Sequence, residues 1–330
     1  MHLPRTDSAP PLLHESAQWL DGITLPHRLA VGFSGGADST ALLLALVAAG
    51  HEVVAWHVDH GWHAASASVA DDLQTRLAGW GIEFHRARVQ VDTGRNREAA
   101  ARHARFACFS TWALEQGIST LCLAQQRNDQ AETVCMRLLQ GAGPAGSAGM
   151  RDERLWQGLR IVRPLLHIGR REIETLLNRH GVGWVEDASN RDTTLLRNRI
   201  RLDLFPAMRK AGCDPVELFG RWQAQAGKLS ARLDVLADRV ALHERDGSAV
   251  VAWEDWRSSP AAVRAVLLQR MNACLFGEGA VLGRRHILLA EEWRRKGGRS
   301  GIDLSGCRLF RSSENLHLAR AQVSLADCLG

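Results

Sequence analysis

The stretch LAVGFSGGADS, residues 29–39, decides the fold of this chain. Residues 29–33 form an apolar, partly β-branched run that is typical of a buried strand. The run breaks at the SGG triplet, and a helical pattern follows over residues 40–49. A glycine-rich turn between a strand and a helix N-terminus presents backbone N–H groups to an anion. The stretch therefore predicts a phosphate site.

The loop residues indicate a magnesium-bound nucleotide. Gly35 and Gly36 allow a tight turn, and Ser34 and Ser39 add hydroxyl donors. Asp38 would repel phosphate unless a cation lay between them, which favours a Mg²⁺-nucleotide. The alternative is a glycine-rich turn in which Asp38 only caps the helix. The GxxxxGK(S/T) pattern of a Walker A loop is absent.

The composition predicts a cytosolic protein with two domains. The chain has 330 residues, of which 45% are apolar, enough for a sizeable core. No run approaches the ~18 consecutive apolar residues of a membrane span, and the start MHLPRTDSAPP has no apolar signal core. The net charge of +5 permits a nucleic-acid partner. We expect a cytoplasmic location and no membrane partner.

The cysteine pattern supports neither a metal or iron–sulfur site nor a disulfide framework. The chain has seven cysteines, an odd number, and no CxxC pair. Each cysteine is expected to be a buried small hydrophobe.

The first part of the chain alternates strand and helix patterns, which predicts an α/β fold with a Rossmann-like parallel sheet. Ligands of such sheets bind beyond the carboxyl ends of the strands. Further strands are expected at residues 53–58, 82–89 and 120–124, and helices at residues 65–80 and 96–116.

The C-terminal part of the chain reads as a smaller α+β domain. Residues 141–149 (GAGPAGSAG) are expected to form no regular element, and residues 213–215 look like a break. We therefore predict a first domain over residues 1–212 and a smaller second domain over residues 213–330. The second domain is expected to contain helices at 217–242, 262–274 and 284–295 and strands at 302–304, 308–310 and 316–319.

Two further motifs follow predicted strands. Asp59 and His60 lie in VDHG, residues 58–61, where adenosine contacts or a group acting on the substrate would fit. The alternative is a polar turn at the strand end, and a zinc set with His63 lacks a further ligand. Asp129 and Glu132 are spaced i and i+3, so they share a helix face. They could hold an ammonium group or a second Mg²⁺, or they could only cap the helix.

Arginines on two helical stretches are candidates for phosphate contacts. Arg102 and Arg105 lie one turn apart, and one of them could reach the ATP phosphates or the transition state. Arg197, Asn198 and Arg201 lie on a helix expected to end near Pro206, which suits phosphate or RNA-backbone contact. The alternative in each case is a solvated helix face. The second helix is expected to dock through Leu195, Ile200, Leu204 and Phe205.

Taken in order, these motifs resemble the tRNA(Ile)-lysidine synthetase family of the PP-loop (N-type) ATP pyrophosphatases. The resemblance covers about residues 29–208. Its motifs are SGGADS (34–39), VDHG (58–61), EAAARHARF (98–106), DQAETVCMRLLQGAGPAG (129–146), RPLL (163–166) and EDASN…RNRIR…P (186–206).

The resemblance implies a two-step ligation that uses ATP and Mg²⁺. ATP adenylates the 2-carbonyl oxygen of the wobble cytidine in the CAU anticodon of tRNA(Ile), and pyrophosphate leaves. The ε-amine of L-lysine then displaces AMP. The product, lysidine, pairs with A instead of G, which changes decoding from AUG to AUA and tRNA identity from methionine to isoleucine.

The resemblance also implies roles for individual residues. Asp38 would hold Mg²⁺, Asp129 and Glu132 would bind the lysine ammonium, and Arg102 or Arg105 would neutralise phosphate charge. Arg197, Asn198 and Arg201 would line the site or touch the tRNA. The oligomeric state stays open, with a homodimer as one alternative. The residues expected to bind ATP are Ser34, Gly35, Gly36, Ala37, Asp38, Ser39, Asp59 and His60.

This chain departs from the family pattern at three places. Gln125-Gln126 stand where the family often has a His-His pair, and Asn128-Asp129 where it often has two aspartates. Trp62-His63 replace the common Leu-Arg after VDHG. Roles of the missing histidines, first aspartate and arginine are therefore not transferred to this chain.

Three rival functions stay open. A PP-loop enzyme for tRNA 2-thiolation usually needs paired catalytic cysteines or an iron–sulfur cluster, and the scattered cysteines argue against it. A glutamine-using amide ligase needs a glutaminase domain or an ammonia source, and 330 residues leave no room for such a domain. A non-catalytic RNA- or nucleotide-binding module would bind tRNA without turning over ATP.

Overall fold

The computed structural model describes residues 10–61, 66–90, 97–186, 194–245, 247–277, 280–304 and 306–321. The chain forms two compact units. Unit 1 comprises Met1–Thr133 and Gly149–Leu218, and unit 2 comprises Val134–Ala148 and Phe219–Gly330.

Unit 1 contains a six-stranded, mostly parallel sheet, which confirms the predicted α/β fold. The strand order is β3-β2-β1-β4-β6-β5. Only the β5–β6 pair, which the sequence analysis missed, is antiparallel. The strands are β1 (Arg28–Gly32), β2 (Glu52–Asp59), β3 (Glu83–Arg88), β4 (Thr120–Leu123), β5 (Glu153–Trp156) and β6 (Leu159–Val162).

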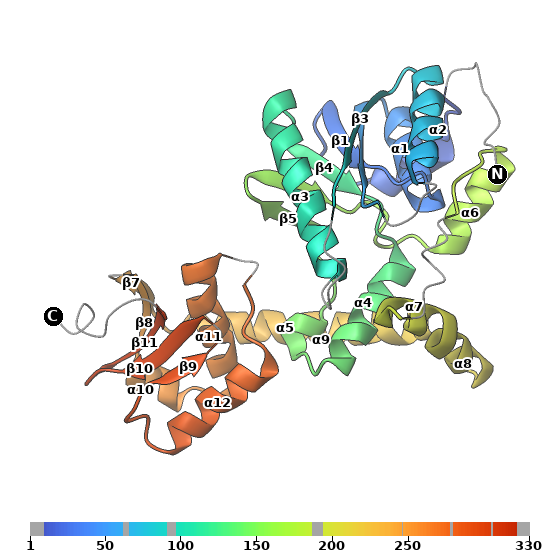
Figure 1. Ribbon diagram of the computed structural model, residues 1–330. Helices are drawn as coiled ribbons and strands as arrows, with labels where there is room; N and C mark the ends of the chain where they lie inside the picture. The colour runs from blue at the N-terminus through green and yellow to red at the C-terminus, as the bar shows by residue number, and fades with distance from the viewer. Residues whose placement is uncertain are drawn as a thin grey trace. The chain divides into compact units, whose positions relative to one another are not determined.

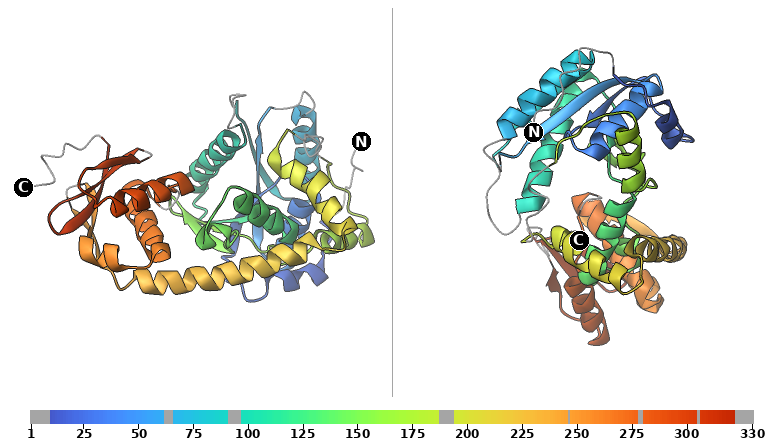
Figure 2. Two further views of the ribbon diagram at one scale, coloured as in Figure 1. Left: turned by 90° about the horizontal axis from the view of Figure 1, so that it is seen from below. Right: turned by 90° about the vertical axis from the view of Figure 1, so that its right-hand side faces the viewer.

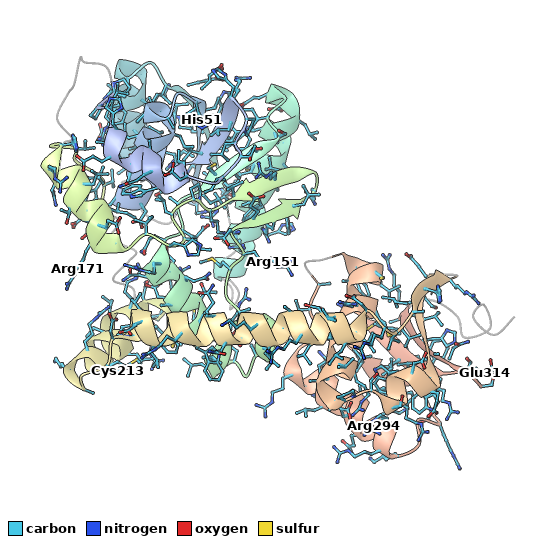
Figure 3. The ribbon with its side chains drawn as sticks, turned by 180° about the vertical axis from the view of Figure 1, so that it is seen from behind. His51, Arg151, Arg171, Cys213, Arg294 and Glu314 are labelled. Atoms are coloured by element: carbon cyan, nitrogen blue, oxygen red, sulfur yellow. The ribbon has the colours of Figure 1, made fainter. Side chains whose placement is uncertain are left out.

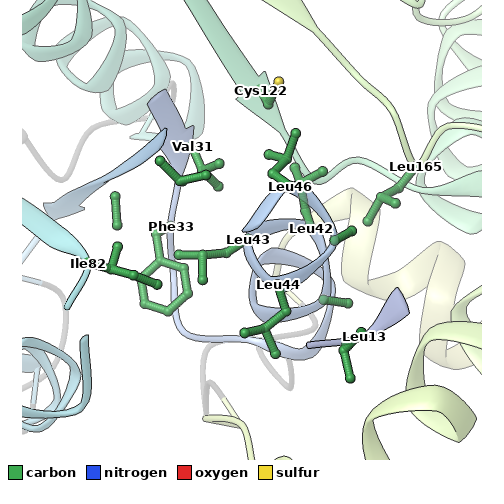
Figure 4. Packing of buried hydrophobic residues seen from close by; sticks show 14 of the residues in the cluster. Leu13, Val31, Phe33, Leu42, Leu43, Leu44, Leu46, Ile82, Cys122 and Leu165 are labelled. Atoms are coloured by element: carbon green, nitrogen blue, oxygen red, sulfur yellow. The ribbon is translucent and has the colours of Figure 1, made fainter. Parts of the chain in front are cut away.

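Helices cover both faces of this sheet because its central strands are apolar on both sides (Figure 1). Leu29 and Val31 of β1 pack into one core cluster, whereas Ala30, between them, packs into another. The first cluster surrounds the apolar helix α1, as Figure 4 shows. The helices that contribute residues to this first cluster are η1 (His14–Leu20), α1 (Ala37–Ala48), α2 (Ser66–Gly79) and α6 (Arg170–Arg179). Residues of α3 (Arg97–Gln116) belong to the cluster on the other face.

The helical stretch that carries Arg197 differs from the prediction. It does not end near Pro206 but continues from α7 (Leu196–Arg199) through a π-helical turn, Ile200–Leu204, into α8 (Phe205–Lys210). Pro206 is the second residue of α8 and directly follows the π-helical turn, where the regular α-helical hydrogen-bond ladder is already interrupted. Ile200 and Phe205 are buried as expected, but Leu204 is exposed.

Unit 2 combines helices with a five-stranded antiparallel sheet of order β7-β8-β11-β10-β9. Its longest helix, α9 (Pro215–Ala237), is unbroken in Figure 2. The break predicted at residues 213–215 lies between α8 and α9, where Figure 3 labels Cys213. The other elements are β7 (Leu242–Arg245), β8 (Ser248–Ala252), α10 (Trp253–Ser258), α11 (Ala261–Phe276), α12 (Arg284–Arg295), β9 (Ile302–Leu304), β10 (Cys307–Arg311) and β11 (Asn315–Arg320).

The structure differs from three expectations based on the sequence. The glycine-rich residues 141–149 contain a short helix, α5 (Pro144–Ser147), because Pro144 suits a helix start. β7, β8 and α10 were not predicted. Not every cysteine is a buried hydrophobe, since Cys274 is exposed and Cys108 and Cys213 are half-buried.

The described residues include no helix that is long and apolar enough to cross a membrane. Part of the predicted site region, residues 187–193, lies outside the described residues, as do Trp62 and His63.

Candidate functional site

The predicted phosphate loop joins β1 to α1. Gly35 has a φ of +78°, a left-handed conformation that glycine adopts without strain. Its carbonyl accepts a hydrogen bond from the N–H of Val185 at 2.8 Å, so a distant part of unit 1 holds the loop in place. The Ser39 hydroxyl lies 3.2 Å from both the N–H and the hydroxyl of Ser34. These contacts join the first residue of the loop, Ser34, to Ser39 in the first turn of α1.

The donor set of the loop fits a phosphate group with a cation. Residues in the first turn of a helix have N–H groups without intrahelical acceptors, and the helix dipole favours an anion there. Asp38 lies in that first turn, and among the described residues no hydrogen-bond partner reaches its shielded Oδ1. Burial, together with the charge of Asp129, raises the pKa of Asp38 to about 7. A divalent cation would compensate the negative charge of this partly buried carboxylate and of the neighbouring Asp129.

The VDHG turn lies at the carboxyl end of β2, beside β1. Asp59 Oδ1 accepts a hydrogen bond from the N–H of Gly61 at 2.8 Å, which fixes the turn. His60 lies near Arg105: burial and that positive charge lower the pKa of His60 to about 4. The imidazole is therefore neutral at physiological pH.

Asp129 and Glu132 lie on α4 (Arg127–Leu139), which begins after β4. As predicted, they share a face, and both contact the same two arginines. Glu132 is nearly fully buried: its Oε2 accepts from Arg197 Nε at 2.8 Å and its Oε1 from Arg201 Nε at 2.7 Å. Asp129 Oδ1 lies 2.8 Å from Arg197 Nη2. Asn198, between the arginines, is buried.

Asp129 also has a structural role at the start of α4. Its Oδ2 accepts a hydrogen bond from the N–H of Gln126 at 3.1 Å. The side chain of Gln126 in turn accepts from the N–H of Asn128 at 2.6 Å. The side chain of Gln126, which stands where the family often has a histidine, therefore supports the start of the helix that carries the two carboxylates.

Positive charge dominates on the side of α3 that carries Arg102 and Arg105. Burial and the charge of Arg197 lower the pKa of Arg105. Arg102 is exposed to solvent overall, but partial desolvation of its guanidinium group and four neighbouring guanidinium groups lower its pKa to about 10. These neighbours are Arg154, Arg105, Arg163 and Arg197.

The structure thus brings the predicted residues of unit 1 close to one another, and it adds residues that the sequence analysis missed. The charge of Asp129 raises the pKa of Asp38, whereas the charges of Arg170 and Arg201 lower it. Arg170, at the start of α6, belongs to no motif, so only the packing of α6 on α1 reveals it. Arg154 was likewise missed because it lies on an unpredicted strand.

Comparison with known families agrees with this arrangement. Residues 13–208, more than half of the chain, match the model of the PP-loop domain. The chain belongs to this family. A PP-loop domain is an ATP-binding domain, which agrees with the expectation that the nucleotide is ATP.

Curated relatives of this PP-loop chain include tRNA(Ile)-lysidine synthases. It is 42% identical over 187 residues to that of Burkholderia mallei (strain ATCC 23344), which covers 54% of this chain and 38% of the relative. It is 34% identical over 285 residues to that of Pseudomonas fluorescens (strain Pf0-1), which covers 83% of this chain and 61% of the relative. The chain therefore spans only part of the length of these relatives.

A solved structure has a similar fold. The U34-tRNA thiolase NcsA from Methanococcus maripaludis, solved with its [4Fe-4S] cluster, matches with a TM-score of 0.51 over 65% of this chain and 78% of its own. At 16% identity, this similarity shows the fold alone.

Proposed function

We propose that this chain is a tRNA(Ile)-lysidine synthase, a ligase that joins L-lysine to the wobble cytidine of the CAU anticodon with ATP. The observation that carries the proposal is the juxtaposition of the phosphate loop with a carboxylate pair on α4, since Asp38 interacts with Asp129. A nucleotide site beside two carboxylates suits the activation of one substrate and the capture of an amine. The curated relatives bear this name.

In the first step, the 2-carbonyl oxygen of cytidine attacks the α-phosphorus of ATP, and pyrophosphate leaves. The loop residues from Ser34 to Ser39 would hold the departing diphosphate through N–H and hydroxyl groups. Asp38 would hold Mg²⁺, which when bound supplies positive charge to the phosphates. Arg105 of α3 lies beside His60, and we propose that both contact the nucleotide, while Asp59 fixes the turn that carries His60.

In the second step, the lysine ε-amine attacks C2 of the adenylated cytidine, loses a proton, and AMP leaves with the oxygen. Glu132 and Asp129 would orient the lysine through its ammonium group. In this structure both carboxylates bind Arg197 and Arg201. The lysine ammonium group therefore has to displace these two guanidinium groups from the carboxylates or share the carboxylates with them. A displaced guanidinium group would then be available for an anionic group of the substrates.

We further propose that residues 1–212 are the catalytic domain and that residues 213–330 contact the tRNA. A homodimer stays a prediction, and the cytoplasm, where tRNA is modified, is the proposed location.

The decisive experiment measures pyrophosphate and AMP release with ATP, Mg²⁺, lysine and a tRNA transcript with the CAU anticodon. We expect release only with all four, and lysine incorporated into the transcript. A transcript with a CAC anticodon, which keeps the wobble cytidine, is the matched control. Product that forms without lysine would exclude ligation, and tRNA binding with no turnover would favour a binding module.

A further inference from the structure

The hairpin of β5 and β6 is fixed against α3 within unit 1. Arg154 and Trp156 are two positions apart on β5, so they share one face of the strand. The rings of Trp156 and Phe106 of α3 lie 5.4 Å apart between centroids. The Ser110 hydroxyl donates a hydrogen bond of 3.2 Å to Gln157 Oε1 in the hairpin turn. Two independent contacts therefore hold the hairpin to the helix.

Two arginines stack on this aromatic pair. Arg154 Cζ lies 5.0 Å from the ring centroids of both Phe106 and Trp156. Arg102, one turn before Phe106 on α3, has its Cζ 5.0 Å from the Phe106 centroid. Stacking orients the planar guanidinium groups through their faces and leaves the N–H groups at their edges available as donors.

No carboxylate of the described residues neutralises these two guanidinium groups. Neither Arg102 nor Arg154 has an ion pair or a hydrogen bond within that part of the chain, and Arg154 Nε is shielded from solvent without a partner. The neighbouring Glu153 points to the other face of β5 and pairs with Arg160, and Asp152 pairs with His167. An oriented pair of cations without counter-charge is an anion site.

The position of Arg154 separates it from the nucleotide loop. β5 is the edge strand, and β6 and β4 lie between it and β1. Three strand spacings correspond to about 14 Å. Phosphates bound at the end of β1, as the proposed function has it, would therefore lie well away from the strand that carries Arg154, which favours a phosphate from a second ligand.

We propose that Arg102 and Arg154 bind a phosphodiester group of the RNA backbone. The proposal rests on an RNA substrate at the nucleotide site, as the proposed function has it, and it assigns Arg102 to the RNA and Arg105 to ATP. RNA fits better than an acidic peptide because guanidinium N–H pairs bind phosphate in a two-pronged geometry.

The test compares Arg154→Gln with Arg86→Gln in the full chain. Arg86 lies on β3, the opposite edge strand of the same sheet, and pairs with Asp71. The probes are a labelled tRNA transcript with the CAU anticodon, titrated at several KCl concentrations, and Mg²⁺-ATP. For Arg154→Gln we expect RNA affinity to fall about 10-fold and the slope of log affinity against log salt to decrease by about 1. ATP affinity should stay within twofold.

Arg154→Lys separates charge from planar stacking. It keeps the cation, so we expect a loss of RNA affinity of about threefold, between wild type and Arg154→Gln. RNA affinity of Arg154→Gln equal to that of Arg86→Gln would overturn the proposal. A loss of ATP affinity with RNA affinity intact would assign Arg154 to the triphosphate instead, and weakened binding of a poly-glutamate peptide alone would favour an acidic protein partner.

The RNA-binding and ATP-binding measurements do not depend on whether the protein ligates lysine. If wild type binds the transcript with an Arg154-dependent salt slope but forms no lysine product, the proposed function fails and the phosphate site stands. If wild type forms the product while Arg154→Gln keeps both RNA affinity and salt slope, the site fails and the proposed function stands.

Discussion

At the residue scale, the environment of Asp38 disfavours its ionised carboxylate. Burial raises its pKa from 3.8 to about 7. The folded chain therefore prefers the protonated form, and the contribution of Asp38 to stability is fully present below pH ~4. That contribution is lost as the pH rises from about 4 to about 7.

Asp38→Asn should remove this pH dependence. Without nucleotide and metal, the Tm of Asp38→Asn should exceed that of wild type, and the gap should widen by roughly 3 °C between pH 5.5 and pH 8. Thermal unfolding at the two pH values measures it. Mg²⁺-ATP at saturation should stabilise only wild type, and a gap that does not change with pH would contradict the assigned burial.

Glu132 is the more buried of the two carboxylates that are proposed to orient lysine. Glu132→Gln should raise the KM for lysine at least about 10-fold and leave the KM for ATP within about twofold, because the neutral amide binds an ammonium group poorly. Steady-state assays with each substrate varied measure it. Glu153→Gln, which breaks an exposed pair with Arg160, is the matched control. Equal rises of both KM values would argue against an ammonium site.

At the element scale, the close packing of β1 against β4 positions the phosphate loop. A Cβ on Gly32, the last residue of β1, would lie 2.6 Å from Leu123 Cδ2. Leu123 is buried at the end of β4, so its side chain has little room to move away. The sequence needs glycine here for space, whereas Gly35 needs it for a positive φ.

Gly32→Ala should therefore destabilise unit 1 by about 1–3 kcal/mol and weaken Mg²⁺-ATP binding, because the strand end carries the loop. Gly220→Ala is the control: it lies in α9 with no atom within 4 Å of an added Cβ, and alanine there should stabilise the helix by about 0.5–1 kcal/mol. Denaturant unfolding and ATP titration measure both variants. If Gly32→Ala were as stable as wild type, the side chain of Leu123 in β4 would have to move away from the added Cβ at little cost in free energy.

At the scale of the whole molecule, each unit has its own apolar core. Trp56 is fully buried in unit 1 and Trp256 in unit 2. The phosphate loop, both carboxylates and the arginines discussed above belong to unit 1. Nucleotide binding should therefore depend on one core only.

Trp256→Ala should destabilise unit 2 by about 3–5 kcal/mol and leave Mg²⁺-ATP affinity within about twofold of wild type. Trp56→Ala, with an equally buried side chain, should weaken both stability and ATP binding. Thermal unfolding with and without ATP, together with ATP titration, measures the contrast. Loss of ATP affinity in Trp256→Ala would show that the nucleotide site needs unit 2.

The sequence by itself determined the elements that local patterns encode. The strand, the glycine-rich turn and α1 follow from an apolar run, a change of period and residues that favour a turn. The same logic predicted β2 to β4 and the i, i+3 placement of Asp129 and Glu132. It missed β5 and β6 because Glu153, Arg154 and Arg160 interrupt their short apolar runs, whereas β4, which is equally short, contains no charged residue. It also ended a helix at Pro206 where the helical stretch continues.

Only the tertiary structure decided which charges meet. Arg197 and Arg201 contact carboxylates 65 to 72 residues away in the sequence, and Arg154 stacks on Phe106 from a different element. No local pattern specifies such pairs, because they depend on how α4, α7 and the hairpin pack around the sheet. The burial that raises the pKa of Asp38 has the same origin.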